Sequence, residues 1–408
     1  MKRPSSLPTM VVLAWLAQVA LAVGLGRSRW AYGPDTVGPA RMYDDVDLYD
    51  KYATKVFEGS VPYRDFEVEY PILALPLFLL PRAFAWDLSA YRAAFGVEML
   101  LIDLAAVALL ARRVAQAEGP GAAPARLAWY SVAVVVLCPM LMTRFDLAPM
   151  ALALAAAIEW GGRRRLLGGA LAAVGTLVKI SPAALAAPAL GWERGRRGSA
   201  KGLGFVGFAA VLAAGGAAWY GLGGEKVRAT FAFHANRPPE LGSFVSGLLI
   251  PAARLAKVPL ALEYVHKSPN VACRWSATAA RLAFPIQGLA LLAVAWRSWR
   301  GRGREPLRHA AAALLAFVAF GKVLSPQYVV WPLALIGAVE GRAGARARPL
   351  YLLACLLTTA IYPWHIEALG HFEAGPVVLL NLRNGLLVAV WLVLMLAPTA
   401  AVPAHTEE

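Results

Sequence analysis

The acidic segment DDVDLYDKYATKVFEGSVPYRDFEVEYP, residues 44–71, has the clearest potential for acid–base chemistry. Its apolar and aromatic residues recur at helical spacing, and these are Tyr49, Tyr52, Ala53 and Val56. Asp45 stands one turn before Tyr49 and falls on the apolar side of the predicted helix, whereas Asp47 falls on its polar side. A partly desolvated carboxylate can act as a general base, which favours Asp45. The alternative is that Asp44 or Asp45 caps the helix.

Cationic side chains stand at the ends of apolar runs further along the chain. Lys179 lies between two such runs, where an ammonium group is costly unless it meets a carboxylate or an anion. A phosphate would satisfy Lys179, and so would Asp146. Arg144 and Asp146 close another apolar run, a position typical of a structural ion pair, although Asp146 is also a rival catalytic carboxylate.

Two later segments, FHANRPPELGSF and GKVLSPQYVVWP, add further polar residues. Their cations are His234, Arg237 and Lys322, and the second segment also holds Gln327 and Tyr328. Arginine and lysine bind phosphate oxygens, and an aromatic ring can stack on a sugar ring. If these segments meet at one face of a membrane, they predict a cavity for a lipid-linked phosphate and a sugar.

The elements that must position these residues are hydrophobic helices. Hydrophobic residues make up 59% of the 408-residue chain and charged residues 16%, which is more apolar surface than a soluble core can hide. Backbone groups find no partner in the hydrocarbon layer, so spanning segments must be helices or a closed barrel. We expect an all-α polytopic membrane protein, a single integral-membrane domain over residues 1–408, with about 10 to 12 transmembrane helices.

The expected spans follow the apolar runs, at residues 9–26, 90–111, 126–142, 147–161, 166–178, 182–192, 201–221, 277–296, 309–321, 326–340, 349–364 and 376–398. The first run follows Lys2 and Arg3 as in a signal peptide, but we expect a retained span. The segment 71–85 holds three prolines, and we expect it to be re-entrant or interfacial. The runs that flank Lys179 fit either two spans or one re-entrant hairpin. We expect the helix that contains Asp45 to lie on the bilayer surface.

Basic residues orient this arrangement. Six clusters fall on one side of it, at residues 2–3, 112–113, 163–165, 194–201, 297–308 and 342–348. The positive-inside rule makes that side cytoplasmic, so the acidic segment and the polar loops face outward. The formal charge of +15 is therefore a topology signal and does not indicate nucleic-acid binding.

Several classes of site are absent from the sequence. Cys138, Cys273 and Cys355 lie far apart without a CxxC spacing, so they predict neither a metal site nor a disulfide framework. There is no Gly-rich phosphate loop, HExxH or GxSxG motif, and a soluble nucleotide donor is not indicated. We expect no metal and no cofactor.

The sequence resembles the polyprenyl-phosphate-mannose-dependent mannosyltransferases of glycosyltransferase family 87, in the GT-C class. Seven features in the family's order carry the resemblance: Asp45 four residues before Tyr49, GSVPYRDFEVEYP, RFDLAP, LVKISP, FHANRPPELGSF, KVLSPQYVVWP, and YPWHIEAL followed by Arg383 and Asn384. The sequence departs from the pattern at Pro239–Glu240–Leu241, which points to a different acceptor.

The resemblance implies inverting transfer of a mannosyl group from a polyprenyl phosphate to a hydroxyl of a glycolipid or polysaccharide, at the outer face of the plasma membrane. By position, Asp45 is the base, with Asp44, Asp47 and Asp146 as rivals. The expected donor-phosphate ligands are Lys179, Arg237, Lys322 and His234. The expected sugar or acceptor ligands are Tyr49, Tyr70, Gln327, Tyr328 and His365.

Two alternatives remain at this stage. One is an arabinofuranosyl or other pentosyl transferase that uses the same kind of donor. The other is a lipid or sugar transporter, which would place ionisable residues inside its spans. Away from span ends, the charged residues are Glu98, Asp103, Arg281 and Arg383. This distribution favours an enzyme that works at the membrane surface.

Overall fold

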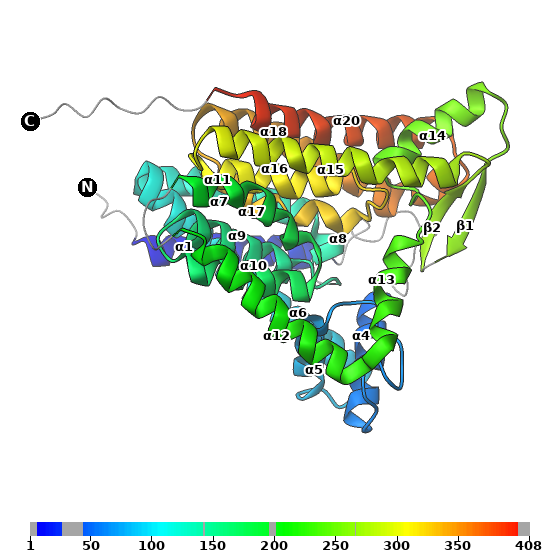
Figure 1. Cartoon of the computed structure of the whole chain (residues 1–408), viewed down its shortest axis with the longest axis horizontal. Coiled ribbons are helices and arrows are strands. Elements are labelled where there is room, and N and C mark those ends of the chain that lie inside the picture. The colour runs from blue at the N-terminus through cyan, green and yellow to red at the C-terminus, as the bar shows by residue number, and fades with distance from the viewer. Residues whose placement is uncertain (1–5, 27–43, 142, 196–200, 266, 399–408) are drawn as a thin grey trace, which may run out of the picture.

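A computed structural model describes residues 6–26, 44–141, 143–195, 201–265 and 267–398 of the chain (Figure 1). The side chains of Gly26, Asp44, Pro139 and His234 lie outside this description. The predicted roles of Asp44 and His234 therefore fall on side chains whose surroundings the structure does not give.

A helical bundle forms the body of the protein. Its helices are α1 (Leu7–Gly26), α6 (Leu88–Glu118), α7 (Ala123–Val136), α8 (Cys138–Leu141), α9 (Leu147–Gly161), α10 (Arg165–Val178), α11 (Ala186–Arg194), α12 (Leu203–Gly223), α15 (Ser276–Arg300), α16 (Pro306–Ala319), α17 (Leu333–Ala338), α18 (Gly341–Thr359) and α20 (Ala374–Leu396). Helices α15, α16, α18 and α20 lie side by side (Figure 1). Among the described residues, five helices are long and apolar enough to cross a membrane. The expected membrane protein built of helices is confirmed, while the number of spans stays a prediction.

Small residues let some of these helices approach closely. A Cβ atom added at Gly169 of α10 would collide with the carbonyl oxygen of Gly204 in α12, and one at Gly207 would collide with that of Leu166. Lipid chains are as apolar as leucine, so helices in a bilayer associate through such close van der Waals packing.

The first apolar run packs as an integral helix of the bundle. Helix α1 lies against α6 and α7. Gln18 of α1 donates a hydrogen bond to Asp103 of α6, and the Tyr130 hydroxyl of α7 donates to the same carboxylate at 2.8 Å. The Asp103 carboxylate thus accepts hydrogen bonds from two neighbouring helices in an apolar interior.

Four expected spans are not continuous α-helices: 126–142 is broken between α7 and α8, 349–364 ends in the π-helical segment η7 (Ala360–Trp364), and the other two begin as 3-10 helices. Residues 182–192 form a short 3-10 helix, η3 (Ser181–Leu185), followed by α11, and residues 326–340 form η6 (Pro326–Val330) followed by α17. The ion pair between Arg165 and Glu193 is 3.3 Å long and joins the start of α10 to the end of α11. The segments that flank Lys179 therefore run antiparallel, which fits both two spans and one re-entrant hairpin.

The first loop predicted to face outward lies between α1 and α6. It holds α4 (Asp44–Phe57), the 3-10 helix η1 (Ile72–Ala74) and α5 (Leu75–Arg82). Helix α4 has the predicted apolar face, but its predicted place on the bilayer surface is wrong. Val46, Tyr49 and Ala53 are at most 1% exposed because α5 and α6 cover them. Helix α5 stays beside α4, with Arg82 3.4 Å from Asp50, as expected of a segment that does not cross.

The predicted all-α fold class holds, with one addition in the second loop predicted to face outward, which lies between α12 and α15. After α13 (Val227–Ala235) and α14 (Phe244–Leu255) this loop forms an antiparallel hairpin of β1 (Ala261–Val265) and β2 (Ser268–Ala272), with Leu262 opposite Val271. The short helix α19 (Ile366–Gly370) follows a π-helical turn, η7 (Ala360–Trp364). The remaining 3-10 turns are η2 (Pro120–Ala122) and η5 (Gly224–Lys226).

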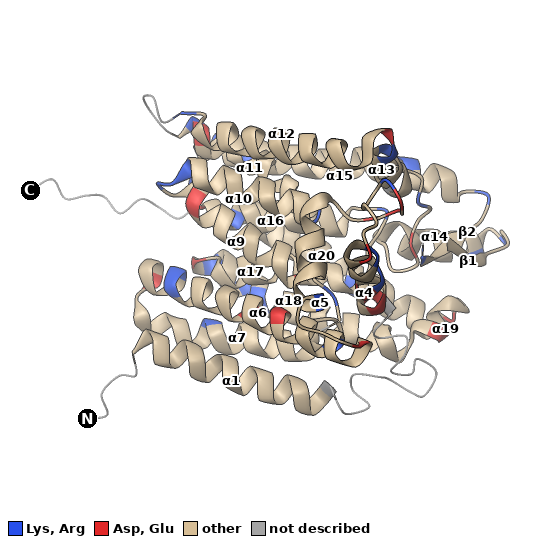
Figure 2. Cartoon of the chain, turned by 90° about the horizontal axis from the view of Figure 1, so that it is seen from below, with Lys and Arg blue, Asp and Glu red and all other residues tan. Residues whose placement is uncertain are grey.

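Basic segments meet at the opposite end of the bundle. Figure 2 shows Lys and Arg at helix ends that lie away from α4, β1, β2 and α19. A Cβ atom added at Gly161, before the cluster 163–165, would collide with Pro306 in the cluster 297–308. The Arg165–Glu193 pair brings the end of α11, with Arg194, to the same place. This arrangement supports the predicted orientation.

We therefore predict that Arg164 faces the cytoplasm and Asp65 the outside. In a background in which the three cysteines are replaced, an impermeant thiol reagent added to intact cells should label Asp65→Cys. Arg164→Cys should react only after permeabilisation, and the cysteine-free parent should not react at all. Labelling of both positions from one side would show that the orientation is wrong.

Candidate active site

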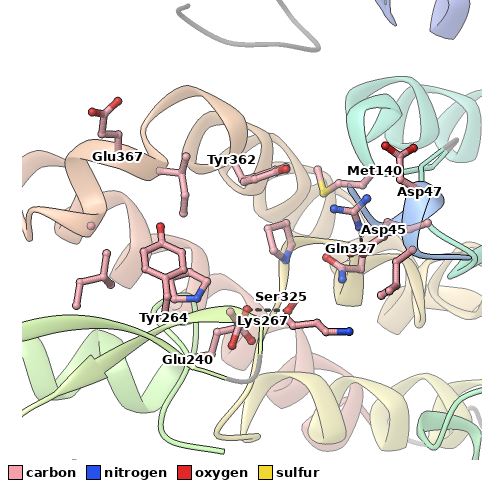
Figure 3. Close-up of a pocket in the computed structure, with 18 of the residues that line it drawn as sticks. Asp45, Asp47, Met140, Glu240, Tyr264, Lys267, Ser325, Gln327, Tyr362 and Glu367 are labelled. Atoms are coloured by element: carbon pink, nitrogen blue, oxygen red, sulfur yellow. Dashed lines mark hydrogen bonds and ion pairs between the residues drawn. The ribbon is translucent and has the colours of Figure 1, made fainter. Parts of the chain in front are cut away.

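A cavity of about 950 Å³ opens among the outer loops (Figure 3). Its walls come from α4, the turn after α8, the hairpin β1–β2, η6 and the segment from η7 to α19. Figure 3 places Asp45 and Asp47 at one end, Tyr264 and Glu367 at the other, and Lys267 between them. Small-molecule sites measure roughly 300–1,000 Å³, so this cavity has room for more than one substrate group.

Asp45 is held by an arginine at the inner end of the cavity. Its Oδ2 atom lies 2.6 Å from Nε of Arg144, and its side chain keeps 31% of its surface exposed. Arg144 belongs to the short turn between α8 and α9, and its side chain is only 13% exposed. The guanidinium group is planar and rigid, so it fixes the direction of the carboxylate. Asp45 thus combines access to the cavity with a fixed orientation.

The rival carboxylate Asp47 also lines the cavity, but Arg92 of α6 binds it through both oxygens. The two hydrogen bonds, from Nε and Nη2, are 2.8 and 2.6 Å long. This fork-to-fork geometry ties α4 to the bundle and uses both carboxylate oxygens as acceptors. Asp47 is therefore better suited to anchoring α4 than to taking a proton.

An aromatic cluster supports the helix that carries Asp45. Tyr49 stacks on Phe78 with ring centroids 4.3 Å apart, and Tyr70 meets Phe145 edge-on at 5.0 Å. Tyr49 is 1% exposed, so α4 is seated on this cluster one turn from Asp45. Packing of this kind positions a side chain more firmly than a solvated loop could.

The third carboxylate, Asp146, is buried with Lys179. Its Oδ1 atom accepts hydrogen bonds from Nζ of Lys179 at 2.7 Å and from Nε1 of Trp331 at 2.6 Å. Nζ of Lys179 also lies 4.4 Å from the ring centroid of Phe145. Asp146 is 1% exposed and Lys179 does not line the cavity, so this pair joins the α8–α9 turn to the turn before η3 and to the end of η6.

Arg237 lies behind the cavity wall. Its Nη2 donates to Oγ of Ser268 at 2.8 Å and stands 3.9 Å from Oε2 of Glu240. Glu240 and Ser268 line the cavity, whereas Arg237 is 7% exposed. Burial raises the pKa of Glu240 above its usual value, and the charge of Arg237 opposes this. Oγ of Ser325 donates to the other oxygen of Glu240 at 2.7 Å.

Lys322 also points away from the cavity. Its Nζ donates to the carbonyl of Ala235 at 2.6 Å and lies 4.9 Å from the ring centroid of Phe284. Burial is the main reason why its pKa is lowered. Among the described residues, the lysines and arginines that line the cavity are Lys51, Arg144 and Lys267. Of these three, only Arg144 was singled out from the sequence, as part of a structural ion pair.

The predicted sugar ligands are placed unevenly. Gln327 lines the cavity. Tyr49 and Tyr70 belong to the aromatic cluster, and Tyr328 stacks on Trp331 at 3.9 Å. His365 is exposed beside η7, where its Nδ1 lies 2.7 Å from the carbonyl of Ala360. The roles of these residues stay predictions.

Several residues that line the cavity were not predicted from the sequence. Tyr264 and Lys267 come from the hairpin, and Glu367 and His371 from α19 and the residue after it. The alternation of Leu262 and Tyr264 with more polar residues before a Lys-Ser-Pro turn was the available strand signal.

Comparison with known proteins decides the family. The sequence model of glycosyltransferase family 87 matches residues 69–326, which is more than half of the chain. The chain belongs to glycosyltransferase family 87. It is therefore a membrane glycosyltransferase, and the transporter alternative is set aside. Among curated proteins, none matches this chain.

The family match covers some parts of the site and not others. It includes Arg144, Asp146, Lys179, Arg237 and the whole hairpin. It begins after α4 and ends before α19, so Asp45 and Glu367 lie outside it. Membership thus establishes the class of enzyme, while the role of Asp45 rests on its geometry and on the sequence resemblance.

The Asp146–Lys179 pair should be structural. Breaking a buried ion pair from one side leaves an uncompensated charge and costs about 3–5 kcal/mol. Lys179→Met should therefore lower the melting temperature of the purified protein markedly, and adding Asp146→Asn should restore much of it. The control is Lys51→Met, which removes an exposed lysine. A Lys179→Met protein as stable as wild type would contradict this and leave Lys179 free for a role with an anion.

Proposed function

We propose that this glycosyltransferase moves a mannosyl group from a polyprenyl-phosphate donor to a hydroxyl of a glycolipid or polysaccharide acceptor, at the outer face of the membrane. The observation that carries the proposal is the pair of Asp45 and Arg144 at the inner end of a large cavity formed by the outer loops. An exposed but oriented carboxylate beside room for two substrates is what a single displacement requires.

In this displacement, Asp45 accepts the proton of the acceptor hydroxyl as the hydroxyl oxygen attacks the anomeric carbon. The bond between that carbon and the phosphate oxygen breaks, and polyprenyl phosphate leaves with the electron pair. The attacking and leaving oxygens lie on opposite faces of the sugar, so the anomeric configuration inverts. The residue that receives the phosphate should therefore stand across the cavity from Asp45.

Among the lysines and arginines of the described cavity wall, Lys267 is the best candidate, because its side chain can turn from its place beside α4 into the cavity. It stands at the tip of the hairpin, while Arg144 is engaged by Asp45 and Lys51 shares α4 with Asp45. Its Nζ lies 3.6 Å from Glu69 and 3.5 Å from the hydroxyl of Tyr52, yet 57% of its side chain is exposed. A mobile ammonium donor can turn to a phosphate. Arg237 supports the same wall through Ser268.

The first test replaces the proposed base. Asp45→Asn keeps the shape of the side chain but cannot accept a proton, so transfer should fall about 10²- to 10⁴-fold. Donor consumption and product should be measured with purified protein and a panel of polyprenyl-phospho-sugars that includes mannosyl and arabinofuranosyl forms. Asp47→Asn is the matched control and should lose much less. Wild-type turnover by Asp45→Asn would move the base elsewhere, and preference for the arabinofuranosyl donor would replace mannose with a pentose.

The second test addresses the leaving group. Lys267→Ala should raise the KM for the donor about threefold to tenfold, because a charged hydrogen bond is worth about 1.5–3 kcal/mol and exposure weakens it. Lys267→Arg should retain most of the affinity. Lys51→Ala removes another lysine of the same cavity and should leave the donor KM unchanged. Equal effects of the two alanine variants would argue against a specific phosphate contact at Lys267.

A further inference from the structure

The outer end of the cavity rests on a hydrophobic cluster of its own. A second group of buried apolar residues, here called the outer core, packs the hairpin, α14, α19 and the start of α20 together; its members are Leu241, Leu249, Ile250, Val271, Ile361, Leu369, Phe372, Val377 and Leu380. Leu262 of β1 packs against this core. A Cβ atom added at Gly370 would lie 3.1 Å from Cδ2 of Leu262, so α19 and β1 touch closely.

The hairpin presents an aromatic ring to the cavity from this support. Residues 262 and 264 share one face of β1 because side chains alternate along a strand, and both line the cavity. Tyr264 is 72% exposed, although it stands opposite Pro269 in a paired strand. Asn270 stabilises the hairpin from its buried side by donating to the carbonyl of Val265 at 2.9 Å. The large ring of Tyr264 is therefore held by a paired strand with its face accessible from the cavity.

The charges at this end differ from those around Asp45. The outer end carries Glu367 and His371, while the lining lysines and arginines come from α4, the α8–α9 turn and the hairpin tip. Figure 3 shows Glu367 and Tyr264 both on the side of the cavity away from Asp45. An anionic group would meet a carboxylate here, with no lysine or arginine among the described lining residues of this end.

We propose that this end binds the acceptor, and that Tyr264 stacks on an uncharged sugar ring of it. The inference rests on the proposed function and adds the class of acceptor, a neutral glycan. The C–H face of a pyranose packs on the apolar face of an aromatic ring, and Glu367 can accept hydrogen bonds from sugar hydroxyls. Tyr264 acts here as a specificity residue that holds the acceptor while its hydroxyl reaches Asp45.

Binding can be measured without turnover. Saturation-transfer NMR is recorded on the full chain in lipid nanodiscs, with α-mannobiose as the probe and its 6-phosphate as the anionic counterpart. A non-transferable phosphonate analogue of polyprenyl-phospho-mannose occupies the donor site. Wild type should bind the neutral disaccharide, and the 6-phosphate should bind more weakly. Tyr264→Ala should weaken the neutral probe about threefold to tenfold, because aromatic stacking is worth about 0.5–1.5 kcal/mol.

Two controls separate stacking from folding. Glu263→Ala alters the opposite, exposed face of the same strand and should bind like wild type, and Tyr264→Trp should retain binding. Equal affinity of wild type and Tyr264→Ala, absent binding to wild type, or preference for the 6-phosphate would overturn the inference. If Asp45→Asn abolishes transfer while Tyr264→Ala binds normally, only this inference fails. If wild type consumes no polyprenyl-phospho-sugar, the proposed function fails, and the binding data still decide the role of Tyr264.

Discussion

The structure of the inner end of the cavity depends on two ion pairs made by one short turn. In the sequence Arg-Phe-Asp, Arg144 binds Asp45 of α4 and Asp146 binds Lys179 between α10 and α11. Phe145 lies between them in the aromatic cluster. Buried charges are tolerated only when they are paired and hydrogen-bonded, so each pair fixes the segments that supply it. Displacing this turn would move the proposed base and the bundle beneath it together.

This constraint explains why α4 is an internal helix. Its apolar stripe would suit a lipid surface equally well, but Asp45 and Asp47 are bound by Arg144 and Arg92, which both belong to the bundle. The charged first turn of α4 therefore meets fixed partners, while Tyr49 enters the aromatic cluster. A carboxylate held in this way stays accessible to the cavity without the freedom of a residue on a surface loop.

Periodicity and charge predicted what local sequence determines. The helical segments, the apolar face of α4 and the common side of the basic clusters could be read from spacing and from the cost of crossing a bilayer. The partner of each buried charge could not be read from the sequence, because Lys179 would bind a phosphate or Asp146 equally well on chemical grounds. Periodicity also cannot distinguish lipid from protein as the cover of Tyr49. The β-hairpin was not predicted, because each of its strands is only five residues long.

The site therefore has two parts with different physical origins. Its inner part rests on charges that the bundle pairs, and that arrangement suits a reaction whose base and leaving group must stand on opposite sides of one carbon atom. Its outer part rests on the outer core, which packs the hairpin and α19 against α14 and the start of α20. Residues such as Tyr264 can consequently change without disturbing the pair of Asp45 and Arg144. An enzyme divided in this way can keep its chemistry while its acceptor varies.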